Sequence, residues 1–368
     1  MKNISKIGFI VFFVLTFAVT IAFAQGISVS QDLPDNPIMS IGPLGEQATS
    51  AKTLSLTATE VDKIRAGNYT AAISFHYSGN DWSNAQARAL QETFEKMGIE
   101  VVAITDAQFK PEKQVSDIET IMAMNPDIIV SIPTDPTATA PAYKRAAEAG
   151  IKLIFMDNVP ANMQPGRDYV SVVSADNYGN GVVSAEIMGE VLNGKGKIGM
   201  IYHDADFFVT EQRAQGFEDT IKKEFPNIEI AAKGGFIDPN DSAGVASAMI
   251  TRNPNLDGIW VNWDVPAEST ISILRSSGIN DIVITTCDLG ENVAINMAQG
   301  GMVKGIGAQL PYWQGVAEAI IAGYSLLGKD VAPYYAVPAL KVTRDNLLEA
   351  WKIAYNTEPP ETITRYFK

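Results

Sequence analysis

Acidic residues follow apolar, strand-like segments at matching positions in two similar parts of the chain. Asp157 follows the segment from Lys152 to Met156, and Asp288 follows the segment from Asp281 to Thr286. Such carboxylates can accept hydrogen bonds from a ligand, cap the next helix, or act as the acid and base of a glycosidase. A glycosidase pair flanks one bond in one cleft, whereas these acids recur as a duplicated feature. The pattern therefore favours ligand binding, with helix capping as the alternative.

Two tryptophans and an arginine add recognition groups of other kinds. Trp82 and Trp263 lie beside Asp, Asn and Ser residues rather than on apolar helical stripes, which favours exposure in a cleft over packing in a core. Indole faces stack on the C–H faces of sugars and polyols, whose hydroxyl groups donate and accept hydrogen bonds. We expect Arg213 to contact the same ligand, and the alternative is a surface ion pair with Glu211 or Asp206.

Two histidines occupy equivalent places just after the first strand of each half. They lie in the sequences Phe75-His76-Tyr77 and Tyr202-His203-Asp204. A zinc site needs three or four ligands in a closed geometry, which two histidines and nearby aspartates do not supply, so no metal is expected. Structural packing is favoured for both rings, and hydrogen bonding of His76, Tyr77 and His203 to the ligand is the alternative.

The sequence contains none of the motifs that would identify an enzyme. The glycines of Asn193-Gly194-Lys195-Gly196-Lys197 precede a strand, so they end a helix rather than bind a pyrophosphate. Cys287 precedes Asp288, whose negative charge disfavours the thiolate. As the single cysteine of the chain, Cys287 forms no intrachain disulfide. We therefore expect a protein without catalytic activity or cofactor.

The segments that carry these residues alternate between strand-like and helix-like patterns. One series runs from Ala71 to Met156, and a second, similar series runs from Lys197 to Thr286. Such alternation predicts an α/β protein with doubly wound parallel sheets of the Rossmann type, one in each of two lobes. Open parallel sheets bind ligands at the carboxyl ends of their strands, so the site is expected in the cleft between the lobes.

Six short motifs, in this order, make the chain from Tyr69 to about Pro338 resemble a known family. They are Ser78-Gly79-Asn80-Asp81-Trp82, Phe155-Met156-Asp157-Asn158, Ser174-Ala175-Asp176-Asn177, Arg213-Ala214-Gln215-Gly216-Phe217, Thr286-Cys287-Asp288 and Gly307-Ala308-Gln309-Leu310-Pro311. The chain resembles the type I periplasmic sugar-binding proteins, in the ribose-binding branch that serves ABC importers. The resemblance implies a hinge of three crossovers, an N-terminal lobe of 68–175 plus 310–338, and a C-terminal lobe of 176–309 plus 339–368.

The resemblance also implies which residues bind the ligand. The matching positions are Asn80, Trp82, Ser83, Asp157, Asn158, Arg213, Trp263, Asp288 and Gln309, together with Phe236 and Ile237 where the family has an aromatic residue before an Asp. Three positions depart from the family: Ser83 replaces an aromatic residue, Asn158 an Arg, and Trp263 an Asn. We therefore expect a neutral sugar or sugar alcohol other than ribose. For Gln309, which lies at a hinge crossover, a purely structural hydrogen bond is the alternative.

Composition and the N-terminal region bear on location and partners. With 28 Lys and Arg against 42 Asp and Glu, the formal charge is −14, which disfavours nucleic acid and anionic membranes as partners. Residues 1–24 have the layout of a secretory signal peptide, with two lysines, an apolar run and Ala22-Phe23-Ala24 before Gln25. Because no cysteine follows the cleavage site, we expect a periplasmic protein without a lipid anchor.

Residues 25–67 are rich in Ser, Thr, Pro and Gly and lack sustained periodicity. They are predicted to be a flexible leader outside both lobes, ending in a short helix near Thr59 to Ala66. For the whole protein, the resemblance implies a monomer whose closed form docks on the permease of an ABC importer. The alternative is a sensing role, in which a closed form carrying a sugar, including an autoinducer-type sugar, docks on a chemoreceptor or sensor kinase.

Overall fold

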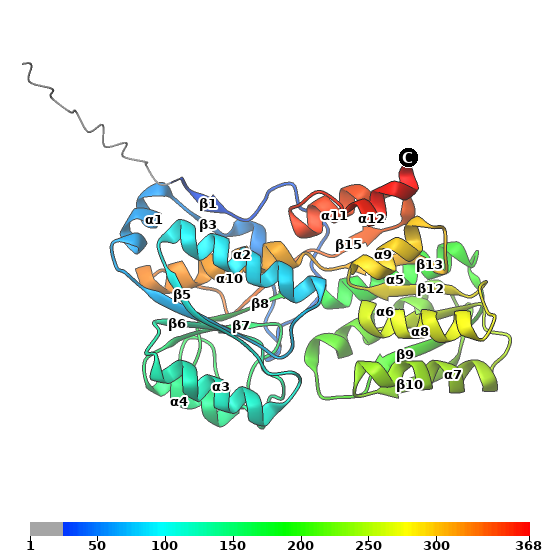
Figure 1. Ribbon diagram of the computed structural model, residues 1–368, viewed down its shortest axis with the longest axis horizontal. Helices are drawn as coiled ribbons and strands as arrows, with labels where there is room; N and C mark the ends of the chain where they lie inside the picture. Colours follow the sequence, from blue (N-terminus) through cyan, green and yellow to red (C-terminus); the bar gives the residue numbers. More distant parts are fainter. Residues whose placement is uncertain (1–24) are drawn as a thin grey trace, which may run out of the picture.

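The computed structural model describes residues 25–368, so the predicted signal peptide of residues 1–24 lies outside the described residues. The chain forms two α/β lobes side by side, each built on its own mainly parallel sheet (Figure 1). The predicted fold class is therefore confirmed. Within residues 25–368, no helix combines the length and apolar character that a bilayer crossing requires.

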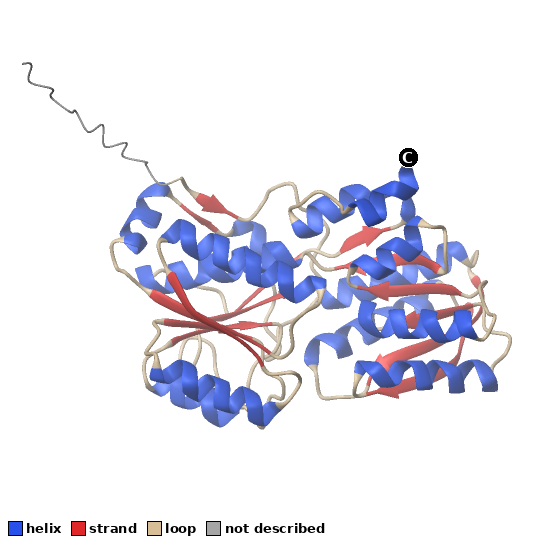
Figure 2. Ribbon diagram, in the orientation of Figure 1, coloured by secondary structure: helices blue, strands red, loops and turns tan. Residues whose placement is uncertain are grey.

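The sheet of the first lobe has seven parallel strands. Their order is β2 (Thr49–Ser50), β14 (Tyr334–Val337), β8 (Ser171–Ala175), β7 (Lys152–Met156), β6 (Ile128–Ser131), β4 (Thr70–Phe75) and β5 (Glu100–Asp106). Three helices cover one face, α1 (Ala58–Arg65), α2 (Asp81–Met97) and α10 (Pro311–Leu327), and two cover the other, α3 (Pro111–Ala123) and α4 (Ala140–Glu148) (Figures 1 and 2). Each face encloses its own apolar core.

The sheet of the second lobe has six strands. Their order is β10 (Asn227–Phe236), β9 (Lys195–His203), β11 (Gly258–Val261), β12 (Val283–Cys287), β13 (Val303–Ala308) and β15 (Leu340–Val342), with only β15 antiparallel. Helices α5 (Asn177–Val191) and α6 (Phe208–Glu224) share one core with it, and α7 (Ser242–Arg252), α8 (Asp264–Ser276) and α9 (Glu291–Ala298) share another. Both sheets are thus sandwiched between helices, as parallel sheets require.

The chain passes between the lobes three times, from β8 to α5, from β13 to α10 and from β14 to β15. Two helices follow β15: α11 (Leu347–Tyr355) and α12 (Glu361–Thr364). Helix α11 contacts α10 of the first lobe as well as β15, while α12 packs on α9 of the second lobe. Single 3-10 turns complete the fold at η1 (Ala51–Thr53), η2 (Pro239–Asp241), η3 (Arg344–Asn346) and η4 (Arg365–Phe367). The segment 339–368, predicted for the second lobe, therefore also contacts the first.

Residues 25–67 are not a flexible leader, and that prediction is wrong. Strand β1 (Ile27–Ser28) pairs with β3 (Ser55–Leu56), and β2 adds an edge to the first sheet. The predicted short helix is present as α1. Apolar side chains of the segment are buried in the core of the first lobe, namely Val29, Leu54, Leu56, Val61 and Ile64. The sequence pattern missed this because strands of two residues are too short to produce an alternation.

The same segment, which we call the N-terminal strap (residues 25–67), also reaches the second lobe. The amides of Met39 and Ser40 donate to the carboxylate of Asp176, at 3.0 and 2.8 Å, where the chain first crosses between lobes. The side-chain amide of Gln212, on α6, donates to the carbonyl of Ile41 at 3.2 Å. The N-terminal strap therefore connects both lobes on the hinge side.

Candidate ligand-binding site

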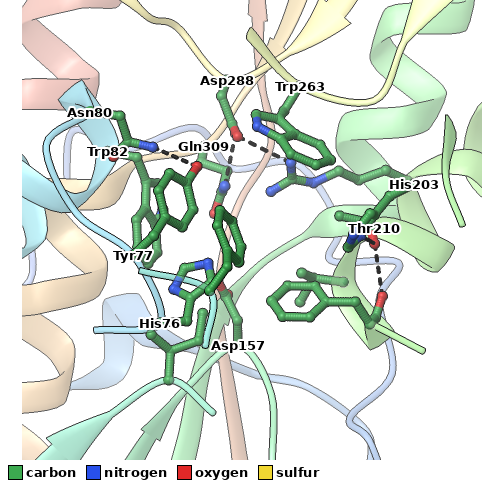
Figure 3. Close-up of a pocket in the computed structure, with 15 residues that line it drawn as sticks. His76, Tyr77, Asn80, Trp82, Asp157, His203, Thr210, Trp263, Asp288 and Gln309 are labelled. Carbon is green, nitrogen blue, oxygen red and sulfur yellow. Dashed lines mark hydrogen bonds and ion pairs between the residues drawn. The ribbon is translucent and has the colours of Figure 1, made fainter. Parts of the chain in front are cut away.

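A narrow cavity of about 50 Å³ lies between the lobes, at the carboxyl ends of both sets of strands. The first lobe contributes His76, Tyr77, Asn80, Trp82, Phe109, Ile132 and Asp157, and the second lobe contributes His203, Phe207, Val209, Thr210, Arg213, Trp263, Asp288 and Gln309. Figure 3 shows Tyr77 and Trp82 on one wall, with Trp263 and His203 on the opposite wall. The structure thus brings ten of the residues predicted from the sequence into one cavity.

Arg213, Asp288 and Gln309 form one buried network at an end of this cavity (Figure 3). Arg213 Nη1 lies 3.1 Å from Asp288 Oδ2, and Gln309 Nε2 donates to Asp288 Oδ1 at 2.8 Å. The guanidinium also donates through Nε to Asn177 Oδ1 at 2.8 Å. The alternative of a surface ion pair with Glu211 or Asp206 is therefore not found, because Arg213 is buried and paired with Asp288.

Close packing of two helices allows Arg213 to reach this position. A β-carbon at Gly181 of α5 would lie 2.1 Å from the carbonyl oxygen of Arg213, and one at Gly216 of α6 would lie 2.2 Å from the carbonyl oxygen of Tyr178. Only glycine permits so close a backbone approach at these two contacts. The Gly in the Arg213-to-Phe217 motif is therefore part of how the arginine is placed.

Asp157 lies at the other end of the cavity (Figure 3). Its Oδ1 accepts a hydrogen bond of 2.6 Å from the Ser174 hydroxyl, a neutral donor. Burial, opposed in part by that hydrogen bond and by the more distant charge of Arg213, raises the pKa of Asp157 to about 6. The carboxylate is therefore held at an energetic cost in a place where a ligand can reach it.

Neither predicted acid caps a helix. Helix α9, which follows Asp288, has Gly290 at its N-cap, and α5, the first helix after Asp157, is capped by Asp176. Asp157 and Asp288 both have left-handed backbones, with φ of +57° and +64°. Aspartate adopts this conformation more readily than most residues. The equivalent turns direct both carboxylates into the cleft.

Aromatic rings form most of the cavity walls. Tyr77 stacks on Phe109 with centroids 4.1 Å apart, and His76 stacks on Phe207 at 5.6 Å, a contact that joins the two lobes. His203 lies edge-on to Trp263 at 5.3 Å and its Nδ1 is 3.0 Å from the Thr210 hydroxyl. The histidines thus pack against rings, as favoured from the sequence, and also line the cavity.

Burial keeps both imidazoles neutral at pH 7. It lowers the pKa of His76 to about 3, with the charge of His203 as a smaller cause, and it lowers the pKa of His203 as well. Several polar atoms at the cavity have no hydrogen-bond partner among the described residues, including His76 Nδ1, Trp82 Nε1 and Gln309 Oε1. Since buried polar atoms are nearly always paired, these are positions for hydrogen bonds to a ligand or to water.

Four predicted residues lie outside the cavity lining. Ser83 lies in the first turn of α2, where its amide donates to Asn80 Oδ1 at 2.8 Å. Asn158 is buried beyond the turn at Asp157, and Phe236 packs behind Trp263 at 5.1 Å between centroids. Ile237 is 72% exposed at the surface. Ser83 and Asn158 each follow a lining residue, Trp82 and Asp157, but side chains of consecutive residues point in different directions and these two do not reach the cavity.

The sequence interpretation missed five lining residues: Phe109, Ile132, Phe207, Val209 and Thr210. Phe109 and Ile132 follow β5 and β6, so the rule that ligands bind at strand ends could have found them. Phe207, Val209 and Thr210 lie at the start of α6, within an apolar stretch after Asp206. Their role depends on interlobe contact, which no local pattern reveals.

Comparison with known proteins agrees with this architecture. Residues 71–329 match the family described as periplasmic binding protein domain. The ribose import binding protein of Salmonella typhimurium is 22% identical over 290 residues, covering 79% of this chain and 95% of that protein. The galactofuranose-binding protein of Escherichia coli is 28% identical over 219 residues, covering 58% and 68%.

Solved structures show the same fold. An ABC transporter solute-binding protein from Agrobacterium vitis, bound with alpha-D-tagatopyranose, superposes with a TM-score of 0.72 at 22% identity, covering 79% of this chain and 100% of that one. A solute-binding protein from Mycobacterium smegmatis with bound glycerol gives 0.70 at 21% identity, covering 80% and 100%. The chain therefore belongs to the periplasmic binding protein family, with the fold of its type I sugar-binding members.

Proposed function

We propose that this protein captures a small sugar or sugar alcohol in the interlobe cavity and delivers it to the permease of an ABC importer. The observation that carries the proposal is that one cavity between the lobes combines aromatic faces with a buried Arg213–Asp288–Gln309 network and with Asp157. Aromatic faces suit C–H surfaces, and ionic and amide groups suit hydroxyls. The expected periplasmic location and lack of a lipid anchor rest on the sequence of residues 1–25.

The proposed mechanism of ligand capture is closure of the two lobes around the solute. The His76–Phe207 stack and the hydrogen bond from the Glu291 amide to Asp81 at 2.7 Å join the lobes and exist only when they are close together. A ligand that contacts Asp157 on one lobe and Asp288 on the other stabilises this closed state over an open one. The permease would then recognise the closed arrangement.

The names of the relatives support import over sensing. The curated relative that is covered over 95% of its length is an import binding protein, and the solved relatives above are solute-binding proteins of ABC transporters. The ligands in those names, ribose, a ketohexose and glycerol, belong to the class of small hydroxylated solutes. We therefore propose delivery to a permease, with no enzymatic step, rather than docking on a chemoreceptor or sensor kinase.

A thermal-shift screen of pentoses, hexoses, deoxysugars and sugar alcohols tests the proposal. A ligand present at one hundred times its Kd stabilises a protein by about 2.7 kcal/mol, which raises the melting temperature by several degrees. The same compound should give no shift with Arg213→Ala, in which the buried network is removed. If no hydroxylated solute shifts the melting temperature of the unmodified protein, the proposed function is wrong.

A further inference from the structure

The cavity contains more acidic groups than cationic groups. Arg213 is the single Lys or Arg among the fifteen residues that line it, and this guanidinium is paired with Asp288. Asp157 faces the same cavity with a neutral partner, the Ser174 hydroxyl. The two imidazoles in the lining are uncharged at pH 7 because burial lowers their pKa values. One carboxylate is therefore left without a counter-charge.

The residues packed around Asp157 do not remove this imbalance. Glu318, fully buried on α10, and Tyr334, on β14, both lie near enough for the Asp157 charge to act on them. Burial raises the pKa of Glu318 well above its usual range, and neither a carboxyl group nor a phenol can supply a positive charge to Asp157. Arg213 acts on Asp157 through its charge, but its ion pair is with Asp288. Burying a charged carboxylate costs free energy of folding unless a cation or several hydrogen-bond donors pair with it.

The other groups at this site are suited to a donor-rich cation. His76 Nδ1 has no hydrogen-bond partner among the described residues and can accept from an ammonium, while the unpartnered Trp82 Nε1 can donate to a hydroxyl of the ligand. The rings of His76, Tyr77, Trp82 and Phe109 form the wall of the first lobe. The faces of such rings attract cations, most strongly when water is excluded. An ammonium group has three donors and no acceptor, which matches these partners.

We propose that the ligand is a small sugar or polyol that carries a protonated amine, whose ammonium group pairs with Asp157 while its hydroxyls bind Arg213, Asp288 and Gln309. This inference rests on the proposed function and specifies its ligand class. The two ends of the cavity then have different tasks: the Asp157 end recognises charge, and the Arg213–Asp288 end recognises hydroxyls (Figure 3). A neutral sugar would leave Asp157 buried without a counter-charge, and an N-acetylated amine would have neither charge nor free donors.

Matched pairs of compounds that differ only by amine and hydroxyl test the inference. Isothermal titration at pH 7.5 would compare D-glucosamine with D-glucose, D-galactosamine with D-galactose, D-mannosamine with D-mannose, and glucamine with sorbitol, with N-acetyl-D-glucosamine as the blocked amine. At least one amine is expected to bind ten times or more tightly than its hydroxyl counterpart, and N-acetylation should abolish the gain. If the hydroxyl compounds bind and no amine binds more tightly, the inference is overturned and the proposed function stands.

The variant Asp157→Asn tests whether Asp157 is responsible for the tighter binding of the amine. It should weaken binding of the preferred amine at least ten times more than it weakens binding of the hydroxyl counterpart. The control Asp330→Asn, at an exposed acid away from the cavity, should change neither. Equal losses for both members of the pair would overturn the assignment of the ammonium to Asp157. If no compound of either kind binds, the proposed function fails together with this inference.

Discussion

The charged carboxylate of Asp157 is expected to favour ligand binding, but its burial disfavours folding of the ligand-free protein. Its carboxylate is buried beside one neutral hydroxyl, and its pKa is raised from the ordinary value of 3.8 to about 6. The native state therefore binds a proton between about pH 4 and pH 6 that the unfolded chain does not. The contribution of Asp157 to stability is most favourable below about pH 4 and is lost as the pH rises through 6.

Asp157→Asn should therefore stabilise the ligand-free protein at pH 7.5. We expect a gain of about 1 to 3 kcal/mol in the free energy of unfolding, because a buried charge is replaced by an amide that can still accept from Ser174. Urea denaturation of both proteins at pH 7.5 and pH 4.5 measures this difference in the free energy of unfolding, and the gain should be smaller at the lower pH. A loss of stability at pH 7.5 would mean that the carboxylate is compensated in the folded protein.

Single residues also mark how far the sequence can predict the site. Asp157, Arg213, Asp288 and Gln309 are recognisable because motifs in a fixed order identify them, and all four line the cavity. Phe207 is not recognisable, because it is defined by its stack on His76 from the other lobe. Local patterns specify which strand end a residue follows, but not which residue of another lobe it meets.

At the scale of elements, helix α9 has its N-terminus at the interface between lobes. Asp81, from the first turn of α2 in the first lobe, accepts a hydrogen bond of 2.7 Å from the amide of Glu291, the first residue of α9 in the second lobe. A carboxylate at a helix N-terminus is favoured by the free amides and by the helix dipole. This contact should stabilise the closed arrangement specifically.

Asp81→Ala is expected to weaken ligand binding about two- to thirtyfold, corresponding to about 0.5 to 2 kcal/mol for loss of a capping interaction. Titration of the ligand found in the screen would measure the affinity. Asp62→Ala, which removes an exposed carboxylate on α1, serves as the control. Unchanged affinity in the Asp81 variant would show that this contact is equally favourable in the open state.

The N-terminal strap is a second element with a testable contribution. It buries Val29, Leu54, Leu56 and other apolar side chains against the first lobe and bonds to Asp176 at the first crossing. Each fully buried aliphatic side chain contributes roughly 1.5 to 3 kcal/mol. Deletion of residues 25–67 should therefore remove several kcal/mol of stability, and the product should aggregate or melt far below the complete chain in calorimetry. A deletion product that melts normally would contradict this role.

Regular elements of ordinary length could be predicted, whereas the strap could not. From β4 to β14, every strand has four or more residues and every α-helix has eight or more, so hydrophobic periodicity identifies them. The strap is held by isolated apolar residues and by hydrogen bonds to residues far along the chain, such as Asp176. Such contacts depend on the completed lobes and leave no periodic signal in the segment itself.

For the molecule as a whole, opening and closing of the lobes should be visible in fluorescence. Trp82 and Trp263 lie on opposite walls of the cavity, where a bound solute would replace water beside both indoles (Figure 3). Saturating ligand should shift or quench the tryptophan emission, and either Trp82→Phe or Trp263→Phe should reduce that change. Trp260→Phe, which alters a fully buried ring stacked on Phe217, should leave it intact. A ligand signal preserved in both cavity variants would remove these tryptophans from the site.

The position of β14 has a consequence for how the chain reaches its native state. Strand β14 (Tyr334–Val337) lies between β8 and β2 in the sheet of the first lobe. This sheet therefore pairs segments from near both ends of the sequence, and the strands β9 to β13 of the second lobe lie between β8 and β14 along the chain. Strands β9 to β13, in contrast, come from one continuous stretch of 195–308. Because pairing between distant segments is slow, strands β9 to β13 should pair early in refolding, and β14 and β15 should join their sheets last. Until β14 and β15 have paired, the edges of β8 and β13 are open to other chains, so aggregation during refolding should begin at these two edges.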